Sequence, residues 1–256
     1  MYREDIMDPW ASLGGTGAAS EDPVQTYPAN NTELAAAGFP AATEIYLPGG
    51  PASGDITGVV ASTVLADVVT PAYRQAFDPT AAVLGAGFTV DTGDAFKAAN
   101  ATFHDANATA IAFLTTVILT TPGTSRDILG KREPAGDGYG YELQHKSDAS
   151  VGFTVKGPAN IDTKYVTPVS GALAYLCCGY SPGRDELVIK TKGDKVVSAG
   201  AYTRNGNTTN TQDFSLGRGK LFTTNMIMGP TYIWEGAGAD TLMASIDAIC
   251  DGWWVY

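Results

Sequence analysis

Short apolar runs separated by turn-forming residues fill the chain from about residue 109 to residue 235, and this spacing restricts the fold most strongly. In residues 139–143 and 151–155, apolar side chains alternate with polar residues or glycine. A period of two places successive side chains on opposite faces of a half-buried strand. The turn residues at 147–149 therefore predict a β-hairpin, and those at 192–194 predict a second one.

Two longer runs, residues 110–119 and 172–180, are apolar on both faces, which is typical of strands in the interior of a sheet. One short helix is predicted over residues 239–250, where Leu242, Ile246 and Ile249 recur at helical spacing. Charged residues make up only 17% of the chain and glycine is abundant, which favours strands and tight turns over a helical bundle. We therefore expect an all-β fold with two antiparallel sheets packed as a jelly-roll sandwich.

Residues 1–54 differ from the remainder because prolines and glycines recur throughout them and prevent any long helix or strand. The segment nevertheless contains many apolar side chains, which a disordered tail does not usually have. We predict an extended arm over residues 1–54 that docks against a surface, followed by the sandwich domain over residues 55–256. The predicted docking anchors are Trp10, Tyr27, Phe39 and Tyr46.

Charge and hydropathy exclude several classes of protein. A net charge of −11 opposes binding to a phosphate backbone, so nucleic acid is not an expected partner. No run of about 18 apolar residues is present, so no membrane span is expected, and the first residues show no secretory signal. Neighbouring Cys177 and Cys178 would point to opposite faces of a strand, and we expect buried free thiols.

The order of these features from about residue 88 to residue 250 resembles the concanavalin A-like, laminin-G-type sandwich family. The resemblance covers roughly two thirds of the chain. It rests on the segments DILGKR, GYELQHKSDASVGFTVKG, ALAYLCCGY, ELVIKTKGDKVVSAG, DFSLGRGK and TYIWEG. It implies the sandwich architecture and a lectin-like character.

Catalytic and metal-binding patterns are weak in this sequence. Both histidines, His104 and His145, are expected to be solvent-exposed turn residues. Sandwich-fold glycosidases carry acids at alternate positions of one strand, and no such pattern occurs, so we expect no catalytic residues. Asp91 and Asp94 could contribute to a calcium site, but Ca²⁺ takes 6–8 oxygen ligands, so neither a metal site nor another cofactor is predicted.

Glycan binding in such folds uses rim loops that combine an aromatic side chain with hydrogen-bonding amides or acids. Residues of these types lie in the predicted loops and strand ends of the second half of the chain. The candidates for glycan binding are Tyr180, Arg184, Asp185, Tyr202, Asn205, Asn207 and Trp234.

The leading hypothesis from the sequence is a structural or accessory virion protein, of a tailed bacteriophage, assembled in the host cytoplasm. It would dock by its arm onto other virion or assembly proteins, form a homo-oligomer and display the sandwich. One alternative is an extracellular glycan-binding module of a cell-surface or secreted protein, with surface glycans as partners. A second alternative is a divergent polysaccharide-degrading enzyme.

Overall fold

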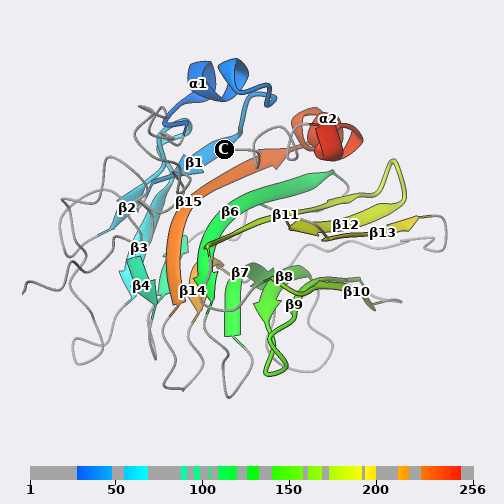
Figure 1. Cartoon of the computed structure of the whole chain (residues 1–256). Coiled ribbons are helices and arrows are strands. Elements are labelled where there is room, and N and C mark those ends of the chain that lie inside the picture. Colours follow the sequence, from blue (N-terminus) through cyan, green and yellow to red (C-terminus); the bar gives the residue numbers. More distant parts are fainter. Residues whose placement is uncertain are drawn as a thin grey trace, which may run out of the picture.

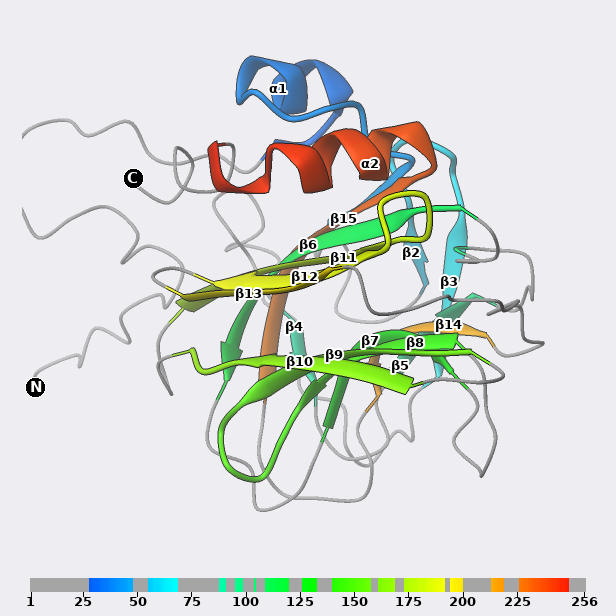
Figure 2. The same ribbon diagram turned by 90° about the vertical axis from the view of Figure 1, so that its right-hand side faces the viewer.

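Two antiparallel β-sheets face each other in this computed structural model, and two short helices lie on the outside of one of them (Figures 1 and 2). The structure describes residues 28–47, 55–68, 88–90, 95–98, 104, 109–119, 126–132, 140–157, 161–168, 173–191, 194–199, 213–218 and 226–248. None of the helices within these ranges is long and apolar enough to cross a membrane.

The first sheet has seven strands and contains the two long apolar runs of the sequence. Its strands in order are β1 (Glu44–Tyr46), β15 (Met226–Glu235), β6 (Ile111–Leu119), β11 (Leu173–Ser181), β12 (Glu186–Thr191) and β13 (Asp194–Ala199), with β4 (Phe88–Val90) also paired to β15. The runs predicted from continuous hydrophobicity, β6 and β11, lie side by side in the middle of this sheet, as expected for strands covered on both faces.

The second sheet has eight strands and contains the first predicted hairpin. Its strands in order are β10 (Ile161–Val166), β9 (Val151–Lys156), β8 (Gly140–His145), β7 (Arg126–Arg132), β14 (Phe214–Arg218), β5 (Ala95–Ala98), β3 (Val64–Val68) and β2 (Ile56–Thr57). Strands β8 and β9 pair with Leu143 opposite Phe153, which places the alternating apolar residues of both strands on one face.

The core between the sheets is aromatic at its centre. The ring of Phe113 on β6 packs against Tyr141, Phe153 and Phe214 of the second sheet, at centroid distances of 5.2, 6.4 and 6.3 Å. Both Phe113 and Phe153 are fully buried, as the period-two alternation predicts. The expected all-β sandwich with two antiparallel sheets is therefore confirmed.

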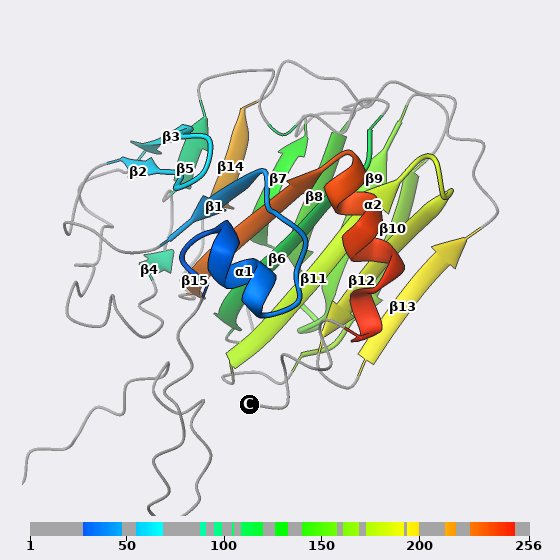
Figure 3. The ribbon, with the colours of Figure 1, turned by 90° about the horizontal axis from the view of Figure 1, so that it is seen from above.

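A second apolar cluster lies on the outer face of the first sheet, beneath the helices α1 (Asn31–Ala36) and α2 (Ala237–Ala244) (Figure 3). Cys177 belongs to this outer cluster, while Cys178 belongs to the core between the sheets, so the two buried free thiols point to opposite faces as predicted. Burial raises the pKa of the Cys178 thiol well above its ordinary value. Helix α2 confirms the predicted C-terminal helix, although it begins two residues earlier.

Residues 28–47 differ from the expected docking arm because they pack on the sandwich of their own chain. Strand β1 pairs with β15, with Ile45 opposite Tyr232. Tyr46 is 2% exposed in the core between the sheets, and Phe39 is 4% exposed in the cluster under the helices. The structure thus corrects the assignment of Phe39 and Tyr46 as anchors for a partner. Trp10 and Tyr27 lie outside the described residues, and their docking role stays a prediction.

Candidate functional site

Polar side chains form a row across four neighbouring strands on the outer face of the second sheet. Residues directly opposite one another in this row are Tyr165 on β10, Gly152 on β9, Gln144 on β8 and Asp127 on β7. Because side chains alternate along a strand, these positions point away from the buried Val151 and Phe153 beside Gly152. The row therefore lies on the face that does not meet the first sheet.

A second row runs parallel to the first, two residues away on β10, β9 and β8 and three residues away on β7. It contains Thr163 on β10, Thr154 on β9 and Glu142 on β8, and continues through Gly130 to Ser215 on β14. The hydroxyl oxygens of Thr154 and Thr163 are 2.8 Å apart, so one hydroxyl donates to the other. We call the surface formed by Asp127, Glu142, Gln144, Thr154, Thr163 and Tyr165 the polar face.

Tyr165 is the exposed aromatic residue of the polar face, with 47% of its surface accessible. Its ring lies over Gly152: a Cβ atom added at Gly152 would be 2.7 Å from Cε1 and 2.9 Å from Cδ1 of the ring. Only a residue without a side chain leaves room for this approach. The glycine thus lets the ring lean across β9 toward the strand that carries Gln144.

Hydrogen bonds order the side chains beside the ring. The Gln144 amide donates through Nε2 to Oδ1 of Asp127 at 2.8 Å, and Oε1 of Gln144 accepts from the Lys146 ammonium group. Both Gln144 and Asp127 are buried, whereas Glu142 and Thr163 are half-buried. On the polar face, Tyr165 is exposed and Glu142 and Thr163 are half-buried, so an aromatic ring, a carboxylate and a hydroxyl can meet a ligand there. The buried Gln144, Asp127 and Thr154 side chains support this surface from within.

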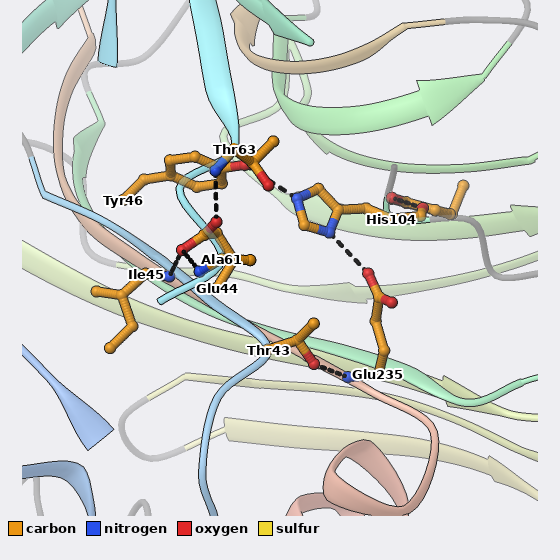
Figure 4. A network of polar contacts seen from close by, with 9 residues as sticks. Thr43, Glu44, Ile45, Tyr46, Ala61, Thr63, His104 and Glu235 are labelled. Atoms are coloured by element: carbon orange, nitrogen blue, oxygen red, sulfur yellow. Dashed lines mark hydrogen bonds and ion pairs between the residues drawn. The ribbon is translucent and has the colours of Figure 1, made fainter. Parts of the chain in front are cut away.

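A separate polar network is centred on His104 and joins the two sheets (Figure 4). Its Nδ1 is 2.7 Å from a carboxylate oxygen of Glu235 on β15, and its Nε2 is 3.0 Å from the Tyr46 hydroxyl on β1. A carboxylate accepts, so Nδ1 donates to Glu235, and Nε2 then accepts a hydrogen bond from the Tyr46 hydroxyl. From the second sheet, the Tyr141 hydroxyl donates to the His104 carbonyl oxygen at 2.5 Å, and the Phe214 ring packs edge-on at 4.7 Å.

The His104 network is built to hold structure rather than to activate a nucleophile. Tyr46 is 2% exposed and His104 is 4% exposed, so no substrate atom can approach the phenol. Burial raises the pKa of Tyr46 above its usual range, and the nearby Glu44 carboxylate adds to this effect. The phenol therefore keeps its proton and serves as a hydrogen-bond donor.

A third network surrounds Glu44, which is fully buried at the start of β1. Its carboxylate accepts hydrogen bonds from the backbone N–H groups of Val60 at 2.8 Å, Ala61 at 3.1 Å and Thr63 at 3.0 Å (Figure 4). Gly58 lies against the same carboxylate, since an added Cβ would be 2.1 Å from its Cδ atom. This single side chain fixes the loop between β2 and β3.

The glycan-binding residues predicted from the sequence are not brought together. Tyr180 on β11 is 2% exposed in the core between the sheets, and Trp234 on β15 is fully buried, with its indole N–H donating to the Pro40 carbonyl at 2.9 Å. Neither ring can stack on a ligand. Arg184 and Asp185 lie in the turn between β11 and β12, where Arg184 forms an ion pair with Glu186 at 2.7 Å. Tyr202, Asn205 and Asn207 lie outside the described residues.

The structure also differs from the sequence-based expectations for the two histidines and for Tyr165. His104 and His145, expected to be exposed turn residues, are 4% and 3% exposed. Tyr165 received no assignment from the sequence, because Asp162 and Lys164 interrupt the hydrophobic alternation of residues 161–166. Among the described residues, no group of three or more metal-ligating side chains occurs, and Asp91 and Asp94 lie outside them.

Comparisons with known proteins place the chain by its fold. No family model and no curated protein matches it. A botulinum neurotoxin serotype D binding domain is similar, with a TM-score of 0.57 and 6% identity over 81% of this chain and 51% of that chain. A botulinum neurotoxin serotype D ligand-binding domain in complex with N-acetylneuraminic acid is similar as well, with a TM-score of 0.54 and 8% identity over 79% of this chain and 50% of that chain.

A mutant of Trypanosoma rangeli sialidase that displays trans-sialidase activity is also similar, with a TM-score of 0.53 and 11% identity over 81% of this chain and 33% of that chain. The chain thus spans about half the length of the neurotoxin domains and a third of the sialidase. At these identities the likeness concerns the fold: this chain forms a jelly-roll β-sandwich of two antiparallel sheets.

Proposed function

We propose that this chain is a glycan-binding module of a cell-surface or secreted protein, and that the polar face is its binding surface. The observation that carries the proposal is the exposed Tyr165 ring, which lies over Gly152 on the same face as the half-buried Thr163. Aromatic rings with a small number of well-placed polar groups are typical of ligand sites. The polar face offers both on rigid strands.

The similar structures support a binding role. One of them is named as a ligand-binding domain in complex with N-acetylneuraminic acid, and another as a neurotoxin binding domain. Since this chain spans about half of each, the part of those proteins that resembles it need not be the part that binds. The polar face therefore supplies the specific reason for the proposal, and the shared fold supplies the general one.

The virion hypothesis depends on an arm that docks onto other proteins, and residues 28–47 of that arm belong instead to the sandwich of their own chain. The two other hypotheses make different predictions about glycans. A module that only binds should retain its ligand unchanged, whereas a polysaccharide-degrading enzyme should release shorter products from it.

The test is a glycan array followed by calorimetric titration of the best ligand. Tyr165→Ala should weaken binding by about tenfold or more, equivalent to about 1.4 kcal/mol. Tyr165→Phe should bind normally, because it keeps the ring. Arg184→Ala, in the turn between β11 and β12, is the matched control for a rim site.

Two results would overturn the proposal. Binding that survives Tyr165→Ala but is lost in Arg184→Ala would place the site in the turn. Hydrolysis of the bound glycan, detected by chromatography after long incubation, would replace the binding module by an enzyme.

A further inference from the structure

The loop between β2 and β3 gathers its backbone N–H groups around one carboxylate, that of Glu44. Its Oε1 accepts from the N–H groups of Ile45 at 3.1 Å, Val60 at 2.8 Å and Ala61 at 3.1 Å, and its Oε2 accepts from that of Thr63 at 3.0 Å (Figure 4). Backbone N–H groups that converge in this way form a nest, which is a concave binding site for anions. Here the bound anion is a side chain of the same protein.

The backbone of residues 58–63 is shaped to present these groups. Ser62 has a φ of 57°, and a left-handed residue within a turn is what directs neighbouring N–H groups into a nest. The N–H group of Gly58 donates to the Thr63 carbonyl at 2.9 Å and closes the loop at its base. A left-handed residue other than glycine is costly and persists only where its surroundings stabilise it. The hydrogen bonds to Glu44 supply that stabilisation.

Backbone dipoles, rather than a cationic side chain of the hairpin, meet the charge of the ligand. Residues 55–68 include two aspartates and neither lysine nor arginine. Hydrogen bonds in which the acceptor is ionised are roughly twice as strong as those between neutral groups. The loop therefore suits an anion better than a neutral group of the same size.

The part of Glu44 that lies in the loop has the size of a small free ion. A Cβ atom added at Gly58 would be 2.1 Å from Cδ of Glu44 and 2.3 and 2.4 Å from its carboxylate oxygens, so the carboxylate lies directly against Gly58. Glu44→Ala would remove Cγ, Cδ and both carboxylate oxygens. These are the heavy atoms of an acetate ion, so the space that the substitution leaves matches acetate.

We infer that residues 58–63 form a carboxylate-binding site, that Glu44 is its built-in ligand, and that a free acetate ion binds there when Glu44→Ala removes the side chain. The site recognises the N-terminal segment of the chain. Strand β1 has only three residues, and the Glu44 carboxylate adds contacts with the loop to the pairing of β1 with β15. This site is separate from the polar face and from the proposed glycan binding.

Thermal unfolding of full-length Glu44→Ala in increasing sodium acetate tests the site, with sodium chloride keeping the ionic strength constant. The melting temperature should rise and level off, by about 3–6 °C at about ten times the Kd of acetate. Acetamide, a neutral molecule of the same shape, should have no such effect. Phe39→Ala is the matched control, because it weakens the same segment and leaves Glu44 in the loop, so acetate should not raise its melting temperature.

A second substitution blocks the site itself. In the double variant Glu44→Ala, Gly58→Ala, the new methyl group takes the position that the carboxylate leaves, so acetate should lose its effect. If Glu44→Ala does not fold in buffer alone, refolding from urea with and without acetate gives the same comparison as a yield of folded protein. Glu44→Gln keeps the size of the side chain without its charge, and should melt at a lower temperature than the unsubstituted protein.

Four results would overturn the inference. Equal stabilisation by acetamide, or of Phe39→Ala by acetate, would show a general solvent effect. A double variant that still responds to acetate would place the bound ion elsewhere. Acetate that changes neither the melting nor the refolding of Glu44→Ala would show that the loop does not bind a free carboxylate. A Glu44→Gln protein as stable as the unsubstituted one would show that the loop does not select an anion.

Discussion

At the scale of single residues, buried polar side chains carry much of this structure. Glu44 accepts three backbone N–H groups of the loop between β2 and β3, and His104 contacts residues of both sheets. Glu44 and His104 thus supply buried groups of the protein with hydrogen bonds that water would make in the unfolded chain. Removal of one such side chain leaves several buried groups unsatisfied, which costs more than the loss of one bond.

Glu44→Ala should lower the free energy of unfolding by about 2–4 kcal/mol, because the N–H groups of Val60, Ala61 and Thr63 would lose their acceptor. Urea unfolding followed by fluorescence measures the change. Asp213→Asn, at an exposed position, is the control and should change the free energy by less than about 0.5 kcal/mol. A similar effect of both substitutions would contradict the assigned role of Glu44.

Alkaline pH should destabilise the fold through two buried phenols. Burial raises the pKa of both Tyr46 and Tyr232 above the ordinary value, so each stays protonated in the folded chain at a pH where it ionises in the unfolded chain. The contribution of the two phenols to the free energy of unfolding is therefore complete below about pH 10. Above that pH, the free energy of unfolding falls by up to about 1.4 kcal/mol per pH unit for each phenol. In urea unfolding between pH 8 and pH 11, the free energy of unfolding should fall less steeply with pH in the double variant Tyr46→Phe, Tyr232→Phe than in the unsubstituted protein. An unchanged pH dependence in the double variant would show that these two phenols do not cause the loss of stability.

Residue burial was the least predictable property of this sequence. The expectation that His104 is exposed followed from its polar neighbours along the chain, whereas its actual neighbours are Tyr46, Glu235 and Phe214, which are distant in sequence. Local composition cannot report such contacts. The burial of Cys177 and Cys178, in contrast, was predictable because the strand that contains them is apolar throughout.

At the scale of elements, patterns that extend over several residues predicted strands well. The hairpin of β8 and β9 and the hairpin of β12 and β13 were both anticipated from alternation and turn residues. Strand β10 was not, because its inward positions include Asp162 and Lys164 beside Val166, so that hydrophobic alternation is interrupted. Strand β1 was missed because its three residues lie between prolines.

The segment before residue 48 should contribute directly to stability. Phe39→Ala removes a ring that is stacked on Trp234 at a centroid distance of 6.0 Å, and should cost about 3–5 kcal/mol. Thr32→Ala, exposed on α1, is the control. Thermal and urea unfolding of the isolated protein give the values. A loss below about 1 kcal/mol would indicate that the segment is bound only loosely.

The aromatic centre of the core gives a second prediction at this scale. Phe113→Ala and Phe153→Ala should each lower the free energy of unfolding by about 3–5 kcal/mol, because both rings are fully buried between the sheets. Their rings are in contact at 6.4 Å, so the double variant should lose less than the sum of the two single losses. Additive losses would show that the two sites relax independently.

At the scale of the whole molecule, the sandwich could be predicted from the sequence, and its polar face could not. Alternation shows which side of a strand faces the core, but the neighbour of each strand follows only from the sheet order. Tyr165, Gln144 and Asp127 come from three strands and form one row only because β10, β9, β8 and β7 are adjacent in that order. The resemblance to lectin-like folds pointed to rim loops instead.

The position of β15 has a consequence for how the protein is made. It is the last described strand along the chain, yet it lies inside the first sheet, between β1 and β6. About 100 residues separate the end of β6 from its start, which a ribosome takes about 5–20 s to synthesise. During that interval the edges of β1 and β6 are open templates for pairing with other chains. We expect translation that stalls before residue 226 to yield aggregates, and a chaperone that covers strand edges to raise the yield of folded protein.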